Sequence, residues 1–226
     1  MNKKKIVLAG LAACMMTMPA MAQTRTEWRD SLTRLNDSIR LKPYDTDLRL
    51  RKAAVNIELE QWDYAAEEYA RVLQIEPKNL AALYYRAYVN TMLRRYDLAK
   101  VDYESFLSIL PKNFEAQLGL AMVKRKIGHS VDALDEMNRL VQVFPDSALA
   151  YAARAGYEAE LKQYELALYD WDEAIKRAPN NKEYKVSKVD VLISLKHYDE
   201  AWRLLEDLMR QGVPKAALKE WIDKCK

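Results

Sequence analysis

The sequence predicts an all-α protein in which about five pairs of helices follow one another along the chain. Three observations predict this fold. Prolines recur every 34 residues, a helix-capping residue follows each of them at the same distance, and columns of small and bulky residues recur with the same spacing. A fixed period of a few tens of residues is typical of solenoid arrays.

The recurring prolines mark the ends of helices. They are Pro43, Pro77, Pro111, Pro145 and Pro179. Proline has no backbone N–H and disfavours the helical conformation in the residue before it, so each one ends a helix. Two positions later come Asp45, Asn79, Asn113, Ser147 and Asn181. Such side chains accept hydrogen bonds from the first free N–H groups of a helix, so a new helix is predicted after each.

Three further columns indicate how the helices pack. Small residues recur at Ala65, Ala99, Ala133, Ala167 and Ala201, and again at Ala53, Ala87, Ala121, Ala155 and Val189. Bulky apolar residues recur at Tyr69, Tyr103, Met137, Trp171 and Leu205. Small residues let helices approach closely and bulky ones fill the space between them. A fourth column opens the second helix of each repeat: Trp62, Tyr96, Ser130, Tyr164 and Tyr198.

Together these columns resemble the tetratricopeptide repeat family. The resemblance implies a right-handed α-solenoid of helix-turn-helix repeats at 46–79, 80–113, 114–147, 148–181 and 182–212, forming one domain over 46–212. The chain departs from the family where basic residues replace apolar ones, as at Arg49, Arg86 and Arg154. We expect their stems to pack while their charges stay in water.

The two ends of the array need covering helices. Residues 23–45 are predicted to form an N-terminal capping helix, with Trp28, Leu32, Leu35 and Ile39 at helical spacing. Residues 213–226 are predicted to form a C-terminal one, with Leu218, Trp221, Ile222 and Cys225 on one face. No linker interrupts the repeats, which favours a single continuous domain.

The first 22 residues have the features of an export signal. Three lysines precede an apolar run, and Ala20-Met21-Ala22 provides a small-residue cleavage site before Gln23. The alternative is a lipobox, Leu11 to Cys14, in which the cysteine is lipidated. We expect a periplasmic or secreted protein, and a membrane-anchored lipoprotein only if Cys14 carries lipid.

Charge and composition exclude several functions. Without residues 1–22 the chain has 33 basic and 33 acidic side chains, so it lacks a basic footprint for nucleic acid. Its remaining glycines are too scattered for a phosphate-binding loop. His129 and His197 lie in separate turns, and carboxylates such as Glu68 and Asp170 fall on second helices, where we expect a solvated face. We predict no cofactor, no metal and no enzymatic activity.

The first helices of tetratricopeptide repeats line a concave groove, which implies that a protein or peptide partner binds there. The predicted partner-binding residues are Tyr84, Tyr85, Tyr88, Met92, Leu118, Met122, Arg125 and Gly156. The alternative for the tyrosines is packing within their own chain, in which case replacing them would lower stability. The predicted function is an exported interaction scaffold, with a lipid-anchored envelope assembly component as the alternative.

Overall fold

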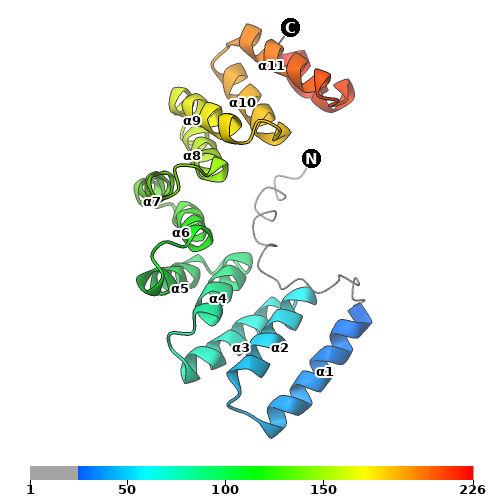
Figure 1. Cartoon of the computed structure of the whole chain (residues 1–226), viewed down its shortest axis with the longest axis vertical. Helices are drawn as coiled ribbons and strands as arrows, with labels where there is room; N and C mark the ends of the chain where they lie inside the picture. Colours follow the sequence, from blue (N-terminus) through cyan, green and yellow to red (C-terminus); the bar gives the residue numbers. More distant parts are fainter. Residues whose placement is uncertain (1–24, 226) are drawn as a thin grey trace. The chain divides into compact units, whose positions relative to one another are not determined.

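The computed structural model describes residues 25–225, and the predicted export signal, with Cys14, lies outside them. Within this range the chain is helical, without strands (Figure 1). The longer helices are α1 Arg25–Leu41, α2 Thr46–Glu58, α3 Trp62–Ile75, α4 Leu80–Met92, α5 Tyr96–Ile109, α6 Phe114–Ile127, α7 Ser130–Val143, α8 Ala148–Glu160, α9 Tyr164–Arg177, α10 Lys182–Ser194 and α11 Tyr198–Arg210. A 3₁₀ turn, η2 Lys215–Leu218, leads into α12 Lys219–Lys224.

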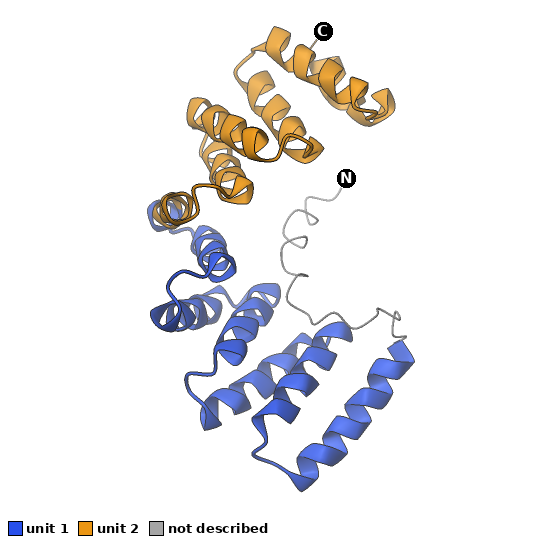
Figure 2. Ribbon diagram, viewed as in Figure 1, with its two compact units in different colours: residues 1–133 blue, residues 134–226 orange. Residues whose placement is uncertain are grey.

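The chain divides into two compact units, Met1–Ala133 and Leu134–Lys226, where the uninterrupted sequence favoured one domain (Figure 2). In unit 1 each helix from α1 to α6 packs against the next. In unit 2, α8 packs on α9, α9 on α10 and α10 on α11. The prediction of an all-helical fold made of consecutive packed helix pairs is confirmed.

Side-chain caps begin the first helix of every repeat, as the sequence predicted. Asp45, Asn79, Asn113 and Ser147 each accept a hydrogen bond from the backbone N–H three residues later. Asn181 accepts from the N–H groups of Glu183 and Tyr184. The second helices begin differently. Where a cap is described for them, its side chain makes no capping bond, as at Gln61 and Arg95.

A left-handed residue turns the chain between the two helices of each repeat. It is Glu60, Arg94, Gly128, Lys162 or Lys196, with φ between 58° and 91°. Only the third repeat places glycine there, where this backbone conformation carries no steric cost. Four of the five positions adopt this left-handed conformation without glycine. The packing of the two helices in each repeat, and not the residue type at the turn, therefore determines the conformation.

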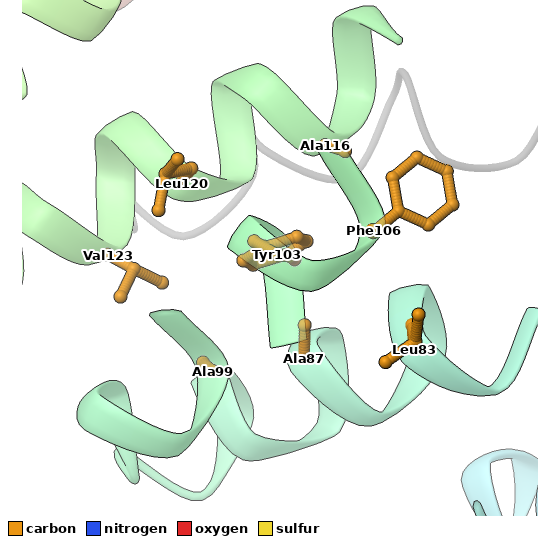
Figure 3. Packing of buried hydrophobic residues seen from close by; sticks show 8 residues of the cluster. All are labelled: Leu83, Ala87, Ala99, Tyr103, Phe106, Ala116, Leu120 and Val123. Atoms are coloured by element: carbon orange, nitrogen blue, oxygen red, sulfur yellow. The ribbon is translucent and has the colours of Figure 1, made fainter. Parts of the chain in front are cut away.

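The predicted packing columns form the core. Both columns of small residues are fully buried, and the column of Tyr69, Tyr103, Met137, Trp171 and Leu205 is buried as well. Figure 3 shows one such cluster, in which Tyr103 and Phe106 of α5 lie among buried side chains of α4 and α6. A Cβ on Gly119 of α6 would come within 2.5 Å of the Tyr103 ring, so this glycine lets the ring pack.

Helices α1 and α12 lie at the two ends of the described range. Leu35 of α1 is buried with Val55 and Leu59, and Trp28 and Leu32 pack against this cluster. At the other end, Leu218 and Ile222 are buried with residues of α10 and α11. Trp221 and Cys225 lie against the same cluster, so all four predicted apolar residues of the final helix contribute to packing.

The expectation that the basic residues replacing apolar ones keep their charges in water is wrong. Arg49 is buried, with its guanidinium bonded to Glu68 and to the carbonyl oxygen of Pro43. Arg86 makes a two-bond ion pair with Asp102, at 2.6 and 2.8 Å. In both repeats a charge pair inside the packing thus joins the first and second helices: Arg86 pairs with an acid sixteen residues later, and Arg49 with Glu68, nineteen residues later.

Candidate partner-binding face

The predicted binding residues of unit 1 lie on two neighbouring first helices, α4 and α6, which contact each other. Met92 is 48% exposed, at the last position of α4. Leu118, Met122 and Arg125 of α6 are half-buried. We call Met92, Leu118, Met122 and Arg125 the first-helix face of unit 1. It carries flexible methionine side chains and a cation close to the solvent, a composition that suits a protein-binding surface.

The three tyrosines are half-buried against their own chain. The ring centroid of Tyr84 lies 5.2 Å from that of Tyr85, 6.1 Å from that of Tyr103 and 5.7 Å from that of Phe106. Tyr85 stacks on Tyr69 of α3 at 6.0 Å. These contacts support the packing alternative for the tyrosines, while partner contact at their remaining exposed edges stays a prediction.

Tyr88 links two repeats and borders the same face. Its ring meets Trp62 of α3 edge to face, with centroids 6.2 Å apart. Burial raises the pKa of the Tyr88 hydroxyl, and the nearby charge of Glu58 raises it further. Burial likewise raises the pKa of Tyr84, so both hydroxyls stay protonated near neutral pH and can donate hydrogen bonds.

Gly156 belongs to unit 2, on α8, and is considered separately from the unit 1 residues. It is half-exposed, and a Cβ built on it would meet no atom within 4 Å. A small residue there leaves open space beside α8. The structure therefore places Gly156 at an accessible position without assigning it a contact.

A cavity of about 510 Å³ lies between α1 and α2. Trp28, Leu35 and Val55 give it an apolar wall, while Arg34, Arg51 and Glu58 stand around it with exposed side chains. This cavity could not be predicted from the sequence, because its size depends on the distance between α1 and α2.

Several carboxylates expected on a solvated face are buried instead. Asp170 of α9 is 1% exposed and bonded to Arg154, and Glu68 is buried between Arg49 and Lys52. Their neighbours Glu67 and Asp172 do lie at the surface. The sequence carried a signal for this pairing: a base at one repeat position recurs with an acid sixteen residues later.

The histidines stand in the turns where the sequence placed them. His129 and His197 are exposed, each with Nδ1 3.5 Å from a carboxylate three residues later. Across residues 25–225 no group of histidine, cysteine and acidic side chains could hold a metal ion. Cys225 is partly buried, and burial raises the pKa of its thiol, which lowers its reactivity. None of the described helices is long and apolar enough to cross a membrane.

The packed helix pairs, the proline-ended repeats and the buried small-residue columns define the tetratricopeptide-repeat fold. A sequence profile of the tetratricopeptide repeat matches residues 115–147, the third repeat. A search of curated proteins finds no match.

Solved structures share this fold. PilW, described as a widely conserved type IV pilus biogenesis factor, is 17% identical with a TM-score of 0.69, over 82% of this chain and 86% of its own. A tetratricopeptide repeat protein from Parabacteroides merdae is 18% identical with a TM-score of 0.62, over 89% and 78%. YrrB, described as having an unusual peptide-binding site, is 17% identical with a TM-score of 0.59, over 76% and 89%. At these identities the likeness shows the fold alone.

Proposed function

We propose that this protein is an interaction scaffold without catalytic activity, which binds a helix or extended peptide of a protein partner on the first-helix face of unit 1. The observation that carries the proposal is the exposure of Met92 beside half-buried Leu118 and Met122 on a neighbouring first helix. Large apolar side chains that remain accessible on contiguous elements are typical of interaction surfaces. YrrB, a protein of this fold that is described as having an unusual peptide-binding site, supports the same proposal.

Photo-crosslinking from matched positions tests this proposal. A benzophenone amino acid replaces Met92 on α4 in one variant and Leu98 on α5 in the other, two apolar residues that are 48% and 57% exposed. Illumination in the native cell envelope should join a protein partner to the Met92 variant and not to the Leu98 variant. Equal crosslinking from both positions, or crosslinking from Leu98 alone, would contradict the assignment.

We further propose that the chain is exported and released after Ala22, on the basis of the apolar run and cleavage site in residues 1–22. Mass spectrometry of the chain recovered from the same cells separates the two alternatives. A free or cyclised Gln23 at the N-terminus supports a released protein of the envelope. A lipid on Cys14 supports the anchored assembly component instead.

A further inference from the structure

Arg154 ties three helices of unit 2 together. From α8 its Nε and Nη2 donate to the two carboxylate oxygens of Asp170 on α9, at 2.5 and 2.7 Å. Its Nη1 donates to the side-chain oxygen of Asn138 on α7, at 3.0 Å. The guanidinium is therefore directed at Asp170 and Asn138, and its one positive charge is matched by the carboxylate of Asp170.

A second carboxylate lies against the same arginine without a comparable bond. Oε1 of Glu158, one turn along α8, is 3.9 Å from Nε of Arg154, beyond hydrogen-bond distance. The Glu158 side chain is 7% exposed, and its Oε2 is buried with no hydrogen-bond partner among the described residues. Two buried acids thus share one base, which leaves a net negative charge in the packing if both are ionised.

The second repeat provides an internal comparison within the chain. Arg86 and Asp102 occupy the positions equivalent to Arg154 and Asp170 and form the same two-bond pair. The position equivalent to Glu158 is Asn90 there, which is also buried. An amide carries no charge, so the second repeat is balanced where the fourth has one acid in excess.

Helix α10 also packs on α8, and two of its lysines form ion pairs with acids other than Glu158. On α10, Lys185 pairs with Asp207 and Lys188 with Asp172. On α7, the side chain that meets Arg154 is uncharged Asn138, and Glu136 pairs with Arg139. The charges acting on Glu158 are those of Arg154 and Asp170, and Asp170 also forms a side-chain hydrogen bond with it.

We propose that Glu158 is a pH-sensitive element of unit 2: it holds a proton in mildly acidic solution and loses it as the pH rises, so that the packing of α8 weakens as the pH approaches neutral. Protonation removes the excess charge and makes the fourth repeat equivalent to the second. Deprotonation restores the uncompensated charge, which opening of α8 relieves by admitting water.

The direction of the effect follows from the electrostatics. Burial raises the pKa of Glu158 from 4.5 to about 7, together with the charge of Asp170 and a side-chain hydrogen bond to it, against the opposing effect of Arg154. The folded chain therefore holds this proton more tightly than the unfolded chain does, so stability is greatest at low pH and falls as the pH rises from 4.5 to 7. Above that range both states are deprotonated and the loss is complete.

Two measurements on the purified chain test the proposal. Carbon NMR of the Glu158 carboxyl should show a midpoint near neutral pH. Hydrogen exchange of α8 amides, corrected for intrinsic rates, should show an opening equilibrium at least about tenfold larger at pH 8 than at pH 5. Amides of α4, beside the balanced Arg86 and Asp102 pair, serve as the internal control and should lack this change.

The variant Glu158→Gln completes the test. It should protect α8 at pH 8 as well as the parent chain is protected at pH 5, and should remove the pH dependence. A pH dependence that persists in Glu158→Gln would overturn the proposal. A Glu158 midpoint below about pH 5.5 in the parent chain, close to that of an ordinary glutamate, would overturn it without recourse to any variant.

Discussion

Tyr84 was predicted to contact a partner, with packing against its own chain as the alternative. Its position on α4, one residue from the buried Leu83, directs it away from the centre of the packing face. Its ring is nevertheless within 6.1 Å of three other aromatic rings, two of them on α5. The sequence could indicate the direction of this side chain but not how far it is buried, because its burial depends on the large side chains of α5 that pack against it.

Replacing Tyr84 should therefore lower stability. We expect Tyr84→Ala to reduce the free energy of unfolding by about 2 to 3 kcal/mol, since the truncation removes a ring from an aromatic cluster. Tyr84→Phe keeps the ring and should stay within about 0.5 kcal/mol of the parent. Urea unfolding followed by circular dichroism measures both. An unchanged midpoint for Tyr84→Ala would show that the ring does not support the fold.

Charge burial is the residue-level feature that sequence reasoning missed. Arg49, Arg86 and Arg154 were expected to extend into water, yet each forms an ion pair on the inside of its repeat. The burial of these charges could be predicted only by comparing two repeat positions, one basic and one acidic, and not from the type of a single residue. The excess negative charge at Glu158 can be recognised only when the structure shows that Asp170 already pairs with Arg154.

At the scale of the helix, local chemistry made the sequence predictive. Proline, a capping side chain and a small residue each act over a few residues, so the five caps and the starts of the second helices follow directly from the spacing. The helix predicted after the cap Asn79 is α4, which begins at Leu80 and ends at Met92. Properties that depend on separation between helices, such as the cavity beside α1, could not be obtained in this way.

The caps give a prediction at this scale. Asn113 accepts a hydrogen bond from the N–H of Ala116 at 2.8 Å, so Asn113→Ala leaves that donor unsatisfied at the start of α6. We expect a loss of about 1 kcal/mol of stability. Lys112→Ala changes an exposed neighbour with no capping role and should be nearly neutral. Thermal unfolding of the two variants side by side compares them; equal midpoints would contradict the role of the cap.

At the scale of the whole molecule, the chain combines a fold that is fixed by repetition with surfaces that differ from repeat to repeat. The small and bulky columns are shared by all five repeats and are buried. The first-helix residues, from Met92 and Leu118 to Gly156, are not repeated, and they lie partly or largely exposed. Conserving the packing while varying the accessible residues is what a binding scaffold requires.

The measurement that tests this account most directly is the affinity of two matched variants for the partner recovered by crosslinking. Met92→Gln places a polar amide on the first-helix face, and Leu98→Gln does the same at a similarly exposed position of α5. We predict that Met92→Gln weakens binding about tenfold or more without changing the unfolding midpoint, while Leu98→Gln binds as the parent does. Undiminished binding by Met92→Gln, together with weakened binding by Leu98→Gln, would contradict the account.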